Sequence, residues 1–187
     1  MYMKNAKVNY LGIVINSAFV LFMIKLDAFV VYVSLPTIAR DFAVNAASAS
    51  LIVISYLLLL TSTMLFFGKI EEKIGVKKLQ IIGYFIFTIG SLLCGLAPGI
   101  NALIFWRAIQ GIGGAMMLTT GFASVSRYLP ENKKGWSMGI ITTAAALGIA
   151  TGAPVGDSFS GFQEYFHFGR CSLCCNFNIQ YFSSAVR

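Results

Sequence analysis

Five long apolar stretches, separated by short polar intervals, constrain this chain more than any other feature of its sequence. They lie at about residues 9–35, 49–67, 79–97, 101–126 and 136–156. A helix needs about 20 mostly apolar residues to cross the hydrocarbon core of a bilayer. Backbone polar groups cannot stay unpaired in hydrocarbon, so we expect each stretch to be helical. The sequence therefore predicts an all-α integral membrane protein with five transmembrane helices.

The composition agrees with lipid as the main solvent. Of the 187 residues, 57% are hydrophobic and only 11% are charged, whereas soluble domains carry about 25% charged residues. The net charge of +7 does not indicate nucleic-acid binding, because the basic residues lie in short gaps between apolar stretches. The first stretch is longer than the ~7–15-residue core of a signal peptide. We therefore expect it to remain as an uncleaved first span.

The basic residues are strongly biased to one side of the predicted spans. Counted alternately over the N-terminus and the intervals between spans, nine lie on the side of the N-terminus, and the loops at 36–48 and 98–100 on the other side hold only Arg40. Because cytoplasmic loops carry the excess of lysine and arginine, we expect a multi-pass protein of the plasma membrane with a cytoplasmic N-terminus. The nine are Lys4, Lys7, Lys69, Lys73, Lys77, Lys78, Arg127, Lys133 and Lys134.

Ionisable side chains also lie inside the predicted spans: Lys25 and Asp27 in the first, and Arg107 in the fourth. At the rise of an α-helix, Asp27 lies about 13 Å from Pro36 and Arg107 about 9 Å from Asn101, which are the outer ends of their spans. The two depths agree within about one helical turn. If the first and fourth helices are neighbours, an ion pair between Asp27 and Arg107 is feasible.

Two interpretations of this pair are open. In one, it is a structural pair that orients two helices. In the other, Asp27 exchanges a proton with solvent or substrate while the neighbouring guanidinium influences its protonation. We favour the second, because ionisable groups buried in membranes usually mark a pathway. Lys25 and Gln110 are candidate cavity residues. The alternative for Lys25 is that its positive charge repels cations. The alternative for Gln110 is that it only forms a hydrogen bond that helps the helices pack.

No cluster in the sequence indicates catalysis or a cofactor. Cys171, Cys174 and Cys175 lie near His167, but no second pair of ligands follows, as a structural zinc site requires. The sequence also shows no nucleophile–base pair and no phosphate loop. We therefore expect neither an enzyme nor a bound metal or other cofactor.

Four motifs together resemble the major facilitator superfamily, in particular its branch of multidrug:proton antiporters with fourteen helices. Residues 26–36, an Asp followed by an apolar run that ends in Leu-Pro, are similar to the first-helix signature of that branch. Residues 68–78 resemble the cytoplasmic loop between helices two and three, and residues 107–115 resemble the fourth-helix motif. The fifth-helix antiporter motif is similar to the set Gly139, Gly148, Gly152, Pro154 and Gly156.

The resemblance implies a fold and a function. Residues 1–156 would be the N-terminal part of a major-facilitator-type helical bundle. Its activity would be proton-coupled efflux of amphipathic small molecules, with Asp27 carrying the proton and Arg107 as its charge partner. The implied partners are membrane lipid, a small-molecule substrate and protons, and not nucleic acid.

The resemblance also implies roles for two further motifs. In a gating loop, Gly68 and Gly75 would permit sharp turns at two helix ends, and charged side chains would form a network. The fifth-helix glycines would face the other half of the transporter, although ordinary helix packing explains their four-residue spacing equally well. The gating-loop residues are Gly68, Glu72, Lys73, Gly75 and Lys77.

The sequence changes in character at residue 157. Residues 157–187 hold three of the four cysteines and the only histidine, with no apolar run of 20 residues. We expect a frameshift or an early stop in a longer coding sequence to truncate a transporter, with residues 157–187 as out-of-frame sequence. The alternatives are one half of a split transporter, completed by a separate C-terminal half, and a non-transporting membrane remnant.

Overall fold

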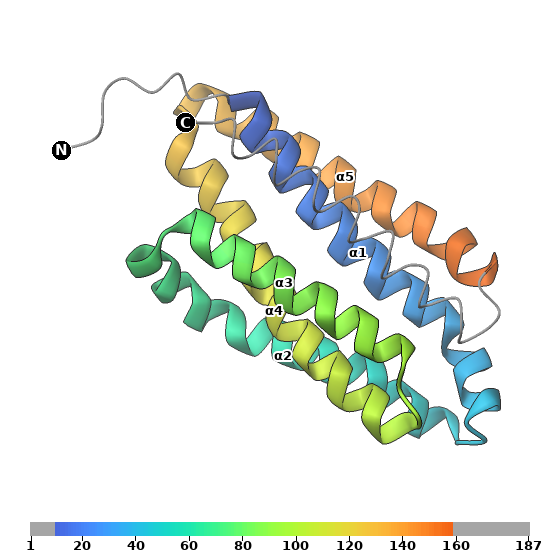
Figure 1. Cartoon of the computed structure of the whole chain (residues 1–187). Coiled ribbons are helices and arrows are strands. Elements are labelled where there is room, and N and C mark those ends of the chain that lie inside the picture. Colours follow the sequence, from blue (N-terminus) through green and yellow to red (C-terminus); the bar gives the residue numbers. More distant parts are fainter. Residues whose placement is uncertain (1–9, 159–187) are drawn as a thin grey trace.

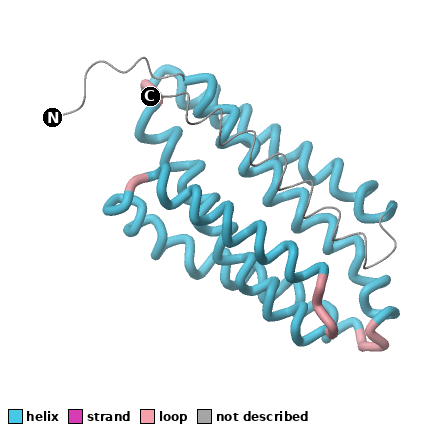
Figure 2. Tube along the Cα trace, in the orientation of Figure 1, coloured by secondary structure: helices cyan, strands magenta, loops and turns pink. Residues whose placement is uncertain are grey.

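The computed structural model describes residues 10–158, which form five α-helices joined by short connections (Figures 1 and 2). The helices are α1 (Tyr10–Asp41), α2 (Ala46–Ile74), α3 (Val76–Gly95), α4 (Ile100–Tyr128) and α5 (Glu131–Ser158). All five are long and apolar enough to cross a membrane. The predicted all-α membrane fold with five spans is confirmed.

The helix ends extend into polar sequence, because leaving the hydrocarbon does not by itself interrupt helical hydrogen bonding. Thus α1 continues through Pro36 to Asp41. Local signals set the limits instead. The side chain of Asn45 accepts a hydrogen bond from the backbone N–H of Ser48 at 2.8 Å and caps the start of α2. Gly75 separates α2 from α3 with a φ of 89°, which side-chain-bearing residues rarely adopt.

The helices form two groups. In Figure 1, α1 (blue) and α5 (orange) run side by side, while α4 packs along both α2 and α3. Contacts of α1 with α4 and α2 join the two groups. Successive helices run in opposite directions, so the α2–α3 and α4–α5 connections lie at the same end of the bundle as the start of α1 (Figure 1).

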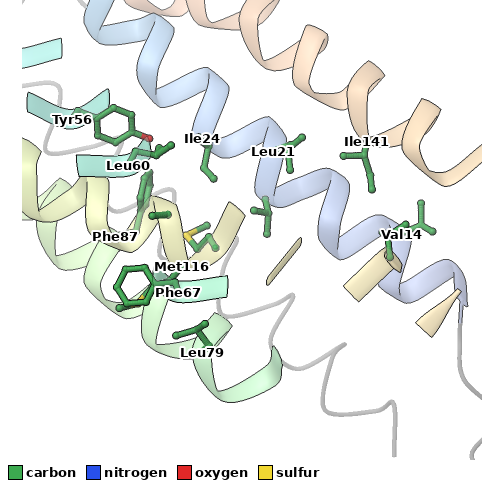
Figure 3. Packing of buried hydrophobic residues seen from close by; sticks show 14 of the residues in the cluster. Val14, Leu21, Ile24, Tyr56, Leu60, Phe67, Leu79, Phe87, Met116 and Ile141 are labelled. Carbon is green, nitrogen blue, oxygen red and sulfur yellow. The ribbon is translucent and has the colours of Figure 1, made fainter. Parts of the chain in front are cut away.

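Buried apolar side chains form two clusters. The larger cluster includes residues from all five helices, among them Ile24, Tyr56, Phe87, Met116 and Ile141 (Figure 3). A smaller cluster contains buried residues of α1, α2, α3 and α4 and lies at the end of the bundle where α1 ends. Many large apolar side chains remain exposed on the outer surface. Lipid tails are as apolar as these side chains, so this exposure is compatible with a bilayer.

Two glycines set the distance between α4 and its neighbours. A Cβ atom at Gly111 would lie 2.6 Å from the carbonyl oxygen of Tyr56 in α2. A Cβ atom at Gly113 would lie 2.6 Å from the backbone nitrogen of Phe87 in α3. Neither position has room for a side chain, so the backbones of α2 and α3 both approach α4 closely.

Candidate functional site

Three polar side chains meet inside the bundle, where α1 contacts α4. Nη1 of Arg107 donates a hydrogen bond to Oδ2 of Asp27 at 2.8 Å, and Nε2 of Gln110 donates to Oδ1 of Asp27 at 3.1 Å. Asp27 and Arg107 are each 3% exposed, and Gln110 is fully buried. Both oxygens of one carboxylate therefore connect α1 to α4. This is the contact that the matching depths of Asp27 and Arg107 made feasible.

Helical spacing explains why these groups converge. Arg107 and Gln110 are three residues apart in α4 and therefore share a face of that helix. Asp27 lies on the same face of α1 as the buried residues Ile24 and Val31, which precede it by three positions and follow it by four. The carboxylate consequently points into the protein interior and away from lipid.

Helices α2 and α3 also reach this site. The ring of Tyr56 lies against the guanidinium group, with its centroid 5.8 Å from Cζ of Arg107. Sγ of Cys94 lies 3.9 Å from Oε1 of Gln110. Tyr56 is not among the residues predicted from the sequence, although its four-residue spacing from the buried residues Ile52 and Leu60 indicates an interior face of α2.

Lys25 does not join the site. It precedes Asp27 by two residues, which is about 200° around an α-helix. Its side chain is exposed, and its Cβ atom lies close to α5, 3.3 Å from where a Cβ atom at Gly148 would be. The structure thus places one cavity candidate, Gln110, in contact with Asp27 and leaves the other on a different face of α1.

The segment expected to form a gating loop is partly helical. Gly68 lies within α2, where an added Cβ atom would make an ordinary contact of 3.9 Å with Thr119. The expectation that Gly68 lies at a helix end is therefore wrong, because the polar residues that follow it continue α2. Gly75 does lie at a helix end. The side chains of Glu72, Lys73 and Lys77 are exposed.

The charge contact at this end of the bundle uses Glu71 instead. Oε1 of Glu71 lies 3.0 Å from Nη1 of Arg127, and Nη2 of Arg127 donates to Oε2 at 3.3 Å. Glu71 is buried, whereas Arg127 is partly exposed. Glu71 is not among the predicted gating-loop residues. Its position four residues after the buried Phe67 indicates the interior only once this segment is known to be helical.

The fifth-helix glycines pack against α1. Cβ atoms at Gly148, Gly152 and Gly156 would lie within 3.0 Å of Phe22, Phe29 and Val30, all of them in α1. The expectation that this face meets the other half of a transporter is therefore wrong for these three glycines, whose close approach is helix packing within the chain. A Cβ atom at Gly139 would meet nothing within 4 Å, and Pro154 is exposed within α5.

Within residues 10–158, no group of three His, Cys, Asp or Glu side chains could hold a metal ion. The cysteines near His167, and almost all of the tail predicted to be out of frame, lie outside the described residues.

Known proteins and protein families are similar to a large part of this chain. The Major Facilitator Superfamily model matches residues 17–168, a range that includes all four motifs. The chain is 39% identical over 135 residues to the riboflavin transporter RibZ of Clostridioides difficile, covering 72% of this chain and 30% of that protein. It is 40% identical over 137 residues to the multidrug resistance protein Stp of Mycobacterium tuberculosis, covering 73% of this chain and 26% of that protein.

A putative multidrug resistance protein, MdtD of Escherichia coli, is 31% identical over 139 residues, covering 74% of this chain and 30% of that protein. The chain therefore spans less than a third of the length of these three relatives.

Proposed function

The chain belongs to the major facilitator superfamily, and from that premise we propose that it is the N-terminal part of a transporter that exports amphipathic small molecules in exchange for protons. It is a multi-pass membrane protein with five apolar helices in its described part. The observation that carries the proposal is the buried contact of Asp27 with Arg107 and Gln110.

The chemistry of this contact suits proton coupling. A buried arginine keeps its proton, so Asp27 is the member of the pair that can gain and lose one. A carboxylate in an apolar interior remains charged at acceptable cost only while it is paired. Protonation removes its negative charge and weakens its hydrogen bonds to both donors of α4. Proton binding would therefore loosen the contact between α1 and α4.

The printed names of the relatives support small organic molecules as substrates. Two are named multidrug resistance proteins, which favours amphipathic drugs. The riboflavin transporter favours a second candidate, transport of riboflavin itself. Transporters of this type bind substrate near the bilayer midplane, between two related halves. The proposal therefore includes a second half, supplied by further helices. It also places the protein in the plasma membrane with the N-terminus in the cytoplasm, as the distribution of basic residues predicts.

Proton movement in inside-out membrane vesicles tests this function. The chain would be expressed in two forms. One is the chain alone, and the other is the chain joined to the part of the riboflavin transporter that follows the matched region. A pH-sensitive dye would report proton release when ethidium or riboflavin is added. We expect release from the joined chain. If neither form moves protons although both insert normally, the chain is a non-transporting membrane protein.

Asp27→Asn in the joined chain tests the role of the carboxylate. The substitution keeps the shape of the side chain but removes the group that binds a proton, so we expect substrate-dependent proton release to be lost. Asp41→Asn is the matched control, because Asp41 is exposed at the end of the same helix. Unchanged proton release in Asp27→Asn would remove Asp27 from the mechanism.

A further inference from the structure

Arg107 contacts the ring of Tyr56 as well as the carboxylate of Asp27. Cζ of Arg107 lies 5.8 Å from the centroid of the ring, within the range of about 6 Å over which a cation is attracted to an aromatic face. Tyr56 is 2% exposed and Arg107 is 3% exposed. Water therefore does not compete for the guanidinium at this contact, and the attraction is stronger than at a protein surface.

The packing of α2 on α4 sets the position of this ring. Gly111 follows Arg107 by four residues and Gly114 follows it by seven, so all three lie on one face of α4. Gly111 lets the backbone of Tyr56 approach α4, since a Cβ atom there would lie 2.6 Å from the Tyr56 carbonyl oxygen. A Cβ atom at Gly114 would lie 3.3 Å from the Tyr56 hydroxyl oxygen. The ring thus occupies space that two missing side chains leave open.

The hydroxyl group contributes little to the contact. It is buried and has no hydrogen-bond partner among residues 10–158. The face of the ring, which carries no titratable atom, is therefore what Tyr56 presents to the guanidinium. The two contacts of Arg107 consequently differ in one respect: a proton can neutralise the Asp27 carboxylate, but it does not change the aromatic face.

We propose that Tyr56 is a positioning residue whose aromatic face holds Arg107 in place whether or not Asp27 carries a proton. This inference rests on the proposed function only in giving Asp27 a proton to bind. When Asp27 is protonated, α1 loses its ionic contact with α4, while Arg107 keeps α4 attached to α2. The guanidinium then stays where the carboxylate can pair with it again after the proton leaves.

A double-mutant cycle on the full chain in lipid nanodiscs tests the proposal through the equilibrium constant of unfolding. Tyr56→Phe keeps the aromatic face and removes only the hydroxyl, whereas Tyr56→Leu removes the ring. Both substitutions would be made with Arg107 present and in the Arg107→Met background. The difference between backgrounds isolates the interaction of the ring with the guanidinium from the space that the ring fills.

With Arg107 present, we expect Tyr56→Phe to leave the unfolding constant unchanged or to lower it, because an unpaired buried hydroxyl is removed. We expect Tyr56→Leu to raise it by about 5- to 30-fold more with Arg107 than in the Arg107→Met background. Equal effects in both backgrounds would mean that the ring only fills space. An equally damaging Tyr56→Phe would assign the contact to the hydroxyl. Either result overturns the proposal.

The same cycle in an Asp27→Asn background tests independence from the carboxylate. Since Asn carries no charge, it stands in for protonated Asp27, and we expect the coupling between Tyr56 and Arg107 to persist. Loss of the coupling would show that the contact of the ring with Arg107 depends on the charge of Asp27, against the proposal. Because the cycle measures stability and not transport, its outcome does not depend on whether the vesicle experiment detects proton movement.

Discussion

Asp27 is the residue on which the interior polar contacts converge. Arg107 lies 80 positions away in the sequence, yet its guanidinium and the amide of Gln110 take one carboxylate oxygen each. This pair is predictable from the sequence, because the helical rise is constant and residue counts therefore convert into depth. The contact of Tyr56 with Arg107 is not predictable in this way, since it depends on how closely α2 approaches the glycines of α4.

The adjacent residues Glu71 and Glu72 are expected to differ sharply in their effects on stability. Glu71 is buried and bonded to Arg127, whereas Glu72 is exposed. Glu71→Gln should destabilise the chain by about 1–3 kcal/mol, because it replaces a buried carboxylate that pairs with Arg127 by a neutral amide and so weakens the contact. Glu72→Gln should change stability by less than about 0.5 kcal/mol. Chemical unfolding of the purified chain measures both, and equal effects would contradict the assignment of Glu71 to the interior.

Among the helices, the pair of α1 and α5 depends on glycines that have no space for a side chain. Gly148→Ala would place a Cβ atom 2.5 Å from the carbonyl oxygen of Phe22. We expect a loss of about 1–3 kcal/mol as α5 is pushed away from α1. Gly139→Ala is the matched control in the same helix, because a Cβ atom there meets nothing within 4 Å; it should leave stability unchanged or raise it slightly.

Thermal unfolding in detergent measures the stability of the Gly148→Ala and Gly139→Ala variants. Proximity of α1 to α5 can be followed separately, by disulfide cross-linking of a cysteine pair placed across the two helices. Gly148→Ala should reduce the cross-linking yield, and Gly139→Ala should not. If Gly148→Ala unfolds and cross-links like the unmodified chain, the close packing of these two helices is not present in the membrane.

For the molecule as a whole, the distribution of basic residues predicts how the bundle crosses the membrane. Lys77 lies near the α2–α3 connection, and Pro98 lies in the α3–α4 connection at the other end. In a chain whose tail cysteines are replaced by Ser, Pro98→Cys should react with an impermeant maleimide in intact cells. Lys77→Cys should react only after the membrane is permeabilised. The reverse pattern would invert the predicted orientation.

Helix α1 meets its neighbours α5 and α4 in different ways. Between α1 and α5 the contact is close backbone packing at Gly148, Gly152 and Gly156, with a hydrogen bond from Ser34 to the carbonyl of Gly156 at 3.4 Å. Between α1 and α4 it includes a buried ion pair. Only the second kind of contact can respond to a proton, so the boundary of α1 with α4 is where protonation would alter the packing.

The sequence by itself determined the number of described spans, their helical state and the depths of the charged residues. These follow from local rules, because hydrocarbon requires every backbone hydrogen bond to be made within the segment and the helical rise converts residue number into depth. Only the tertiary structure decided which helices are neighbours, where α2 ends, and that the glycines of α5 pack against α1. In lipid, an apolar face packs about as well on lipid as on protein, so apolar periodicity alone does not select a partner. The partners depend instead on close contacts such as those at Gly111 and Gly148, which exist only once the helices are packed together.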